Sequence, residues 1–201
     1  NEYILRYDAT FNFPRFADVN VGATARRLTI NSALASPFGV NNPFSAAPTR
    51  VDTVAVDQSD DVDIAGAYLE LVRTVGAVDL TASVRGDRFG QSEASRLAPR
   101  AAVTWRPTGK LSVSGTWGRY HQQVPIVFTA NIADNASLSP MQADHGVLGA
   151  RWTPRDNLLL SVEAFDRQYR DYPVARAYSQ LSLANTGDQN GVSDLLFPMT
   201  S

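Results

Sequence analysis

The stretch that decides the fold runs from Trp105 to Pro125 and reads WRPTGKLSVSGTWGRYHQQVP. Apolar and polar residues alternate through its middle, the first set being Leu111, Val113, Gly115 and Trp117 and the second Ser112, Ser114 and Thr116. A period of two predicts a β-strand with one apolar and one polar face. A soluble sandwich buries such an apolar face in a core, whereas a membrane barrel turns it to lipid. Which environment applies decides the function.

The same alternation recurs along the chain, and no stretch shows a helical period. The predicted strands are residues 2–13, 19–31, 62–75, 77–89, 97–106, 110–121, 145–153 and 157–170. Many of these runs are about ten to fourteen residues long, whereas strands of globular proteins have about five or six. A tilted membrane-spanning strand needs about 9–11 residues. Strand length therefore favours the wall of a barrel.

The connections between the predicted strands alternate between short and long. The short ones are residues 12–19, 74–79, 106–110 and 153–157, and the longer ones are 32–61, 90–96 and 122–144. Proline or glycine supplies the turn geometry in the short connections. Outer-membrane barrels have short periplasmic turns and long extracellular loops, so the pattern predicts an all-β, antiparallel transmembrane barrel segment of about eight strands.

Composition narrows the classes of function. The chain has 201 residues with a net charge of −2, so its overall charge gives no basic balance that calls for nucleic acid, and it has no cysteine for disulfides or thiolate sites. The longest uncharged stretch, Leu28 to Thr49, contains three prolines and predicts no transmembrane helix. Both ends look abrupt, so we expect a piece of a longer protein, with residues 1–201 forming a partial barrel domain without a plug domain.

No stretch predicts catalysis, a metal site or a cofactor. The two histidines, His121 and His145, fall at predicted strand ends; a catalytic triad would need one of them beside a serine on the lipid face, and we interpret both as rim residues. The acidic run DQSDDVD, Asp57 to Asp63, lacks the ligand spacing and the glycine of a calcium loop. We interpret that run as a solvated extracellular loop, with loose divalent binding left open. Phosphate-loop and dinucleotide-binding fingerprints are absent.

Several motifs follow one another in a recognisable order. They are Pro99-Arg100, Trp105, Trp117-Gly118, Gln123 to Pro125, Leu138 to Ala143, Glu163-Ala164-Phe165 and Tyr169 to Asp171. In this order and spacing, residues 97–192 resemble the later barrel portion of TonB-dependent outer-membrane receptors. The resemblance implies a 22-stranded barrel in the outer membrane, with a plug domain in its lumen. It also implies energised uptake of a scarce ligand.

The resemblance further implies the partners: membrane lipid and lipopolysaccharide, the TonB complex acting through a plug outside this chain, and a small ligand that the sequence does not identify. We expect that ligand to touch the long loops and the upper inner wall. The candidate ligand-binding residues are Arg119, His121, Gln122, Gln123, Tyr169 and Arg170. Two alternatives remain open, namely a complete eight-stranded barrel (an adhesin, a structural protein or a lipid-acting enzyme) and a soluble β-sandwich that acts as a binding module.

Overall fold

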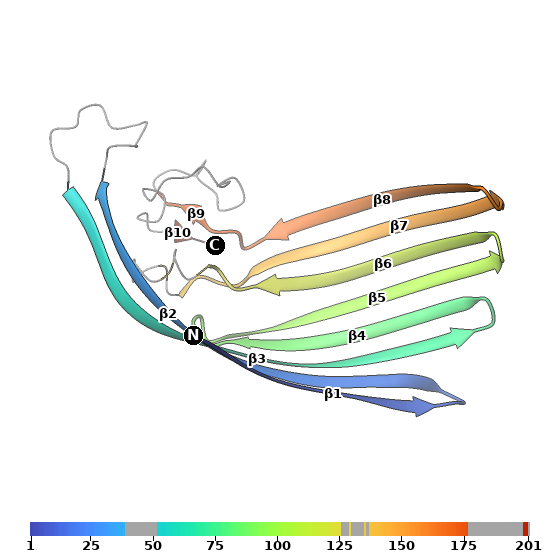
Figure 1. Ribbon diagram of the computed structural model, residues 1–201, viewed down its shortest axis with the longest axis horizontal. Coiled ribbons are helices and arrows are strands. Elements are labelled where there is room, and N and C mark those ends of the chain that lie inside the picture. Colours follow the sequence, from blue (N-terminus) through green and yellow to red (C-terminus); the bar gives the residue numbers. More distant parts are fainter. Residues whose placement is uncertain (39–51, 126–128, 130–134, 136, 177–198, 201) are drawn as a thin grey trace.

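The computed structural model describes residues 1–38, 52–125, 129, 135, 137–176 and 199–200. Eight long strands form one antiparallel sheet in which each strand pairs with the next along the chain (Figure 1). The strands are β1 Glu2–Phe13, β2 Ala17–Phe38, β3 Asp52–Val75, β4 Val78–Phe89, β5 Ala94–Thr108, β6 Leu111–Gln122, β7 Met141–Arg155 and β8 Leu158–Arg170. A separate pair joins β9 Val174–Ala175 and β10 Met199–Thr200. The predicted all-β, eight-stranded architecture is confirmed.

The register places apolar side chains in rows across one face of the sheet. One such row, across β4 to β7, contains Leu80, Val103, Gly115 and Leu148. Large apolar side chains on this face are exposed, including Val113 and Trp117 of β6. No second sheet covers them within the described residues, which contradicts the β-sandwich alternative. We call this apolar surface the outer face and the opposite, polar surface the inner face.

The short turns lie together at one end of the sheet, as predicted from their length (Figure 1). They occupy residues 14–16, 76–77, 109–110 and 156–157. In the second turn Gly76 has a φ of 59°, a left-handed conformation that glycine adopts without steric cost. The connections after β4 and β6 leave from the opposite end of the sheet. The predicted placement of the short turns at one rim is therefore confirmed, whereas the connection predicted at residues 90–96 is only a turn of residues 90–93.

Two predicted strand boundaries are wrong, namely the end of the strand at residues 19–31 and the start of the strand at residues 62–75. The connection expected at residues 32–61 is largely strand, because β2 continues to Phe38 and β3 begins at Asp52. The two strands pair with each other beyond the rest of the sheet (Figure 1), so the backbone groups on their facing sides satisfy one another. The run Asp57 to Asp63 is accordingly part of β3 and not a loop. Residues 39–51 lie outside the described residues.

The sheet is open, with β1 at one edge and β8 at the other. A closed eight-stranded barrel would require β1 to pair with β8, and the described residues of these strands pair only with β2 and β7. The alternative of a complete eight-stranded barrel is therefore wrong. Within the described part of the chain, no helix is long and apolar enough to cross a membrane.

The described residues contain little packed core. The buried cluster consists of Val124, Leu138 and Met141, with Tyr172 packed against it. This cluster lies where the connection between β6 and β7 meets the segment that follows β8. It anchors the end of the sheet away from the short turns, which is also the region that holds the candidate site.

Candidate ligand-binding site

Two ion pairs lie on the inner face of the sheet, one on β1 and one on β4. Arg6 donates to Asp8 at 2.5 Å, and the hydroxyl of Tyr68 donates to the same carboxylate at 2.8 Å. Arg85 pairs with Asp87 at 2.7 Å. Partnered charges of this kind suit a wet wall and would be costly against lipid.

Two glycines make room for these polar side chains. A Cβ on Gly22 would lie 2.4 Å from the ring of Tyr68, and a Cβ on Gly66 would lie 2.3 Å from the carboxylate of Asp87. Both distances are far below ordinary contact. Glycine at these two positions therefore leaves the space that the side chains of Tyr68 and Asp87 occupy.

A ladder of rings follows β6, β7 and β8 across the inner face at the end away from the short turns. Its rings are Tyr120, His145, Tyr169 and Tyr172, with centroids of successive rings 5.1, 6.3 and 5.3 Å apart. The guanidinium of Arg100 on β5 stacks over Tyr120 at 4.4 Å. These separations are typical of aromatic and cation–π contacts. We call this set of five residues the aromatic ladder.

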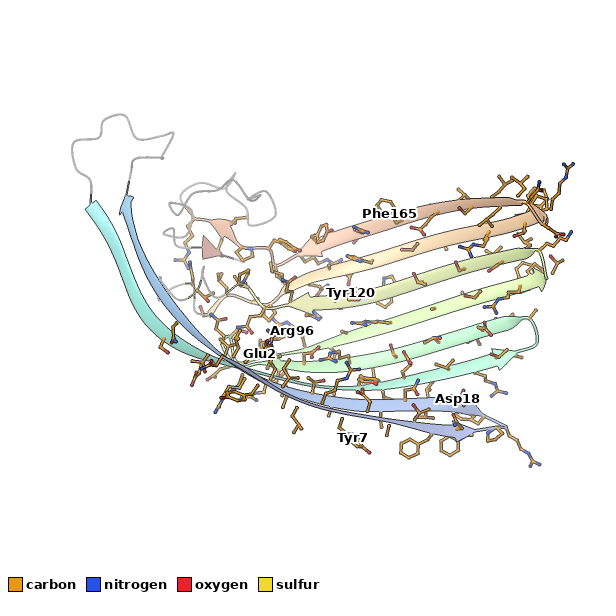
Figure 2. The ribbon with its side chains drawn as sticks, viewed as in Figure 1. Glu2, Tyr7, Asp18, Arg96, Tyr120 and Phe165 are labelled. Carbon is orange, nitrogen blue, oxygen red and sulfur yellow. The ribbon has the colours of Figure 1, made fainter. Side chains whose placement is uncertain are left out.

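The register explains how the ladder forms. Arg100 pairs with Gly118, and Gly118 pairs with His145. Because Gly118 has no side chain, Arg100 and Tyr120 both reach over it; a Cβ there would lie 3.1 Å from each. Tyr120 lies near the end of β6, as Figure 2 shows. The ladder joins four strands through contacts between side chains that are separated in the sequence.

The ladder is accessible from the inner side. Tyr120 is 40% exposed and Tyr169 is 53% exposed. A second cation–π pair lies nearby, with the guanidinium of Arg167 at 5.1 Å from the ring of Phe165. Figure 2 places Phe165 on the edge strand β8. Exposed rings and guanidinium groups together form a surface that suits a planar or aromatic ligand with negative charge.

The structure separates the predicted ligand-binding residues onto two faces. Tyr169 belongs to the aromatic ladder on the inner face. Arg119, His121 and Arg170 occupy the alternate positions of their strands, on the same face as Trp117 and beyond its apolar rows. Only Tyr169 of the six therefore contributes to the ladder.

Arg119 and His121 are already engaged by neighbours on β7. Arg119 forms two hydrogen bonds with Asp144, at 2.7 and 3.0 Å. The Nε2 atom of His121 lies 3.3 Å from Oε1 of Gln142. These contacts hold the ends of β6 and β7 together.

The remaining predicted residues lie along the connection after β6. Gln122 is exposed at the last position of β6. Gln123 donates to Gln91 in the turn between β4 and β5, and Gln91 in turn donates to Thr129. This chain of hydrogen bonds ties the connection after β6 to the rim of the sheet. Gln122 and Arg170, like Tyr169, are exposed.

Breaking the Arg119–Asp144 pair is expected to lower stability measurably. The side chains are only 32% and 11% exposed, so Asp144→Ala leaves a guanidinium without its partner in a half-buried position. The matched control is Asp63→Ala, which breaks the similar two-bond pair with Arg27 where the side chains are 60% and 56% exposed. Exposed pairs contribute little. The urea midpoint of the full-length receptor should fall for D144A and barely change for D63A; equal midpoints would contradict the argument.

The sequence pattern does not predict the aromatic ladder as a unit, although it indicates which face of the sheet one of its residues occupies. Ser114 and Thr116 were assigned to the polar face, and extending the same parity reaches Tyr120. The positions of Arg100 and His145 opposite Gly118 depend on strand register, which the sequence pattern alone does not fix. No group of three or more potential metal ligands occurs among the described residues.

Comparison with known proteins is consistent with this architecture. The sequence profile of a family described as TonB dependent receptor-like, beta-barrel matches residues 2–191. No curated protein sequence matches the chain.

Solved structures share the fold at low sequence identity. The ferric enterobactin receptor PfeA of Pseudomonas aeruginosa is 12% identical, with a TM-score of 0.66 over 84% of this chain and 26% of that one. The siderophore receptor PirA of Acinetobacter baumannii is 16% identical, with a TM-score of 0.63 over 87% and 27%. The FrpB iron transporter of Neisseria meningitidis is 15% identical, with a TM-score of 0.64 over 87% and 30%. The chain therefore spans less than a third of the length of these proteins.

Proposed function

Because the chain belongs to the TonB-dependent receptor β-barrel family, its sheet is part of the wall of an outer-membrane receptor, and we propose that this receptor takes up a scarce ligand by energised transport. The activity we propose is transport and not catalysis. The open edges at β1 and β8 support a larger wall, for which we propose 22 strands. A plug domain outside this chain would occupy the lumen and connect the receptor to the TonB complex.

The proposed orientation follows from the two rims of the sheet. Short turns face the periplasm in barrels of this kind, and long connections face the outside. The aromatic ladder then lies on the inner wall at the extracellular end, where a ligand arriving from outside would first meet the barrel. Its position supports a role in capture before transport.

The aromatic ladder supports the proposed chemical class of the ligand. It presents phenol rings and a guanidinium on one exposed surface, and Arg167 with Phe165 repeats that combination nearby. An anionic chelate with aromatic groups can stack on the rings while its charge meets the arginines. We propose an iron-loaded siderophore of this chemistry. The printed descriptions of the similar structures, which name receptors for siderophores and a transporter for iron, support the same class.

Removing two rings of the ladder tests this proposal. The full-length receptor with Tyr120→Leu and Tyr169→Leu should bind an aromatic ferric siderophore roughly tenfold or more weakly, because each exposed cation–π or stacking contact contributes about 0.5–1 kcal/mol or more. Binding is measured by fluorescence titration, and uptake with radioactive iron. Tyr7→Leu is the matched control, since it removes a phenol from the outer face at the edge strand β1 (Figure 2).

The outcomes separate clearly. Loss of binding and uptake in the double variant, with Tyr7→Leu unchanged, supports the proposed site. Unchanged affinity of the folded double variant would place the ligand elsewhere. Weaker binding of a non-aromatic ferric chelate to the same extent would contradict stacking as the basis of recognition.

A further inference from the structure

Three basic side chains lie in one row across the inner face, and the aromatic ladder runs through that row. The register places Arg100 opposite Gly118, Gly118 opposite His145, and His145 opposite Arg167. Both arginines are exposed, and neither forms an ion pair within the described part of the chain. Neighbouring strands lie about 4.8 Å apart, so the row spans roughly 15 Å. We call Arg100, His145 and Arg167 the basic row.

The described wall around His145 places no carboxylate beside the basic row. Its inner-face neighbours in the same row and the two adjoining rows of β6 to β8 are Thr116, Gly118, Tyr120, Ala143, Val147, Phe165, Arg167 and Tyr169. Asp144 and Asp166 are adjacent in sequence but occupy the outer face, where Arg119 and Gln168 donate to them. The strands therefore leave the positive charge of the basic row unbalanced on the inner face.

The segment after β8 adds one ring and one exposed acid. Tyr172 contacts Tyr169, with ring centroids 5.3 Å apart. Asp171 is exposed and has a φ of 57°, which turns the chain away from the direction of β8. A ligand that carries negative charge would thus meet the two arginines and the imidazole on the wall of the sheet itself.

His145 is the member of the basic row whose charge can change. Its ring lies between Tyr120 and Tyr169, at centroid distances of 5.1 and 6.3 Å. Its Nε2 atom is buried and has no hydrogen-bond partner among the described residues, and a buried polar atom without a partner costs free energy. An anionic oxygen of a ligand that accepts a hydrogen bond from the protonated ring would remove this cost and add a charge-assisted bond.

We propose that His145 binds the anionic group of an aromatic ligand in its protonated form, so that the receptor takes up a proton when it captures the ligand. This inference rests on the proposed function, because it concerns the same site. A negative group between Arg100 and Arg167 attracts a protonated imidazole and favours that charged form. Proton binding and ligand binding therefore favour each other by the same factor. The affinity for an anionic aromatic ligand accordingly rises as the pH falls.

The test titrates the full-length receptor with naphthalenesulfonate, an aromatic anion whose own charge does not change over the range in which histidine gains a proton. Fluorescence should show an affinity roughly fivefold or more higher at about pH 5.5 than at about pH 8. His145→Gln should bind weakly at both values. His145→Arg, a permanent cation, should bind tightly at both values. The two substitutions act in opposite directions, so a folding defect cannot produce the expected pair of results.

His121→Gln is the matched control. His121 is the other histidine of the chain and lies on the outer face beside Gln142, so this variant should keep the full pH dependence. A pH dependence that survives unchanged in His145→Gln would overturn the inference, as would its loss in His121→Gln. An equal gain in affinity at low pH for the neutral naphthalenesulfonamide would also overturn it, because the anionic group would then not be the cause.

The variant with Tyr120→Leu and Tyr169→Leu separates this inference from the proposed function. If the unaltered receptor binds naphthalenesulfonate and the double variant does not, the aromatic ladder is the binding site whatever the pH dependence proves to be. A constant affinity across the pH range would then overturn only the role of His145. No binding by the unaltered receptor at either pH would overturn the inference together with the proposed class of ligand.

Discussion

Leu148→Arg is expected to prevent most of the receptor from reaching its folded state in the membrane. Leu148 lies in the middle of β7 on the outer face and is 68% exposed. An arginine facing lipid near the bilayer midplane costs about 2–4 kcal/mol, which is a large part of the stability of a typical protein. The folded fraction is measured in lipid vesicles by the heat-dependent shift in electrophoretic mobility that folded barrels show.

The neighbouring residue provides the matched control. Val147 lies on the same strand but on the inner face, in the row that contains Thr116 and Phe165. Val147→Arg introduces the same side chain at almost the same depth on the inner face, away from lipid, and the receptor should fold normally. Equal folded fractions for the two arginine variants would contradict the assignment of the two faces, and with it the membrane orientation of the whole sheet.

That assignment was available from the sequence, because a strand has only two faces and a period of exactly two. The alternation around Val113 and Trp117 predicted one apolar face, and strand length together with loop asymmetry indicated that this face meets lipid. The structure confirms the eight strands and the four short turns. The alternating pattern alone was sufficient to assign the two faces, because the membrane imposes the same polarity on every strand of the wall.

The ends of the strands were less predictable, since pairing between neighbours decides them. β2 and β3 continue far beyond the apolar surface, where neither lipid nor a core selects an alternating pattern. Their extension depends on the backbone hydrogen bonds between the two facing strands, and proline and polar residues in the sequence concealed it. The acidic run Asp57 to Asp63 was therefore assigned to a loop although it belongs to a strand.

The candidate site was predictable only in part. A position near the extracellular rim follows from the loop pattern, and Tyr169 was selected on that basis. Arg119 was selected for the same reason, but its partner Asp144 is 25 residues away in the sequence, and only the register between β6 and β7 shows that they meet. Parity would have separated Arg119 from Tyr120, because adjacent residues of a strand face opposite sides.

Gly90→Ala is expected to produce the second large effect, by displacing the turn between β4 and β5. The amide of Gly90 donates to the carbonyl oxygen of Asp63 at 2.8 Å, and a Cβ on Gly90 would lie 2.7 Å from that same oxygen. The oxygen cannot retreat easily, since Asp63 is held in the ladder with β2. The turn must move instead, which sacrifices the hydrogen bond and loosens the buried Phe89. We expect a loss of about 1–3 kcal/mol.

Gly109→Ala is the control for this substitution, because a Cβ on Gly109 would have no atom within 4 Å. Its effect should stay within about 0.5 kcal/mol, as for most surface substitutions. The urea midpoint of the full-length receptor compares the two variants, and limited proteolysis at residues 90–93 reports whether the turn itself has opened. A shared midpoint, or an intact turn in Gly90→Ala, would show that the Asp63 carbonyl does not hold this turn in place. New cleavage confined to the turn would show that the contact with Asp63 holds the turn between β4 and β5 at the extracellular rim.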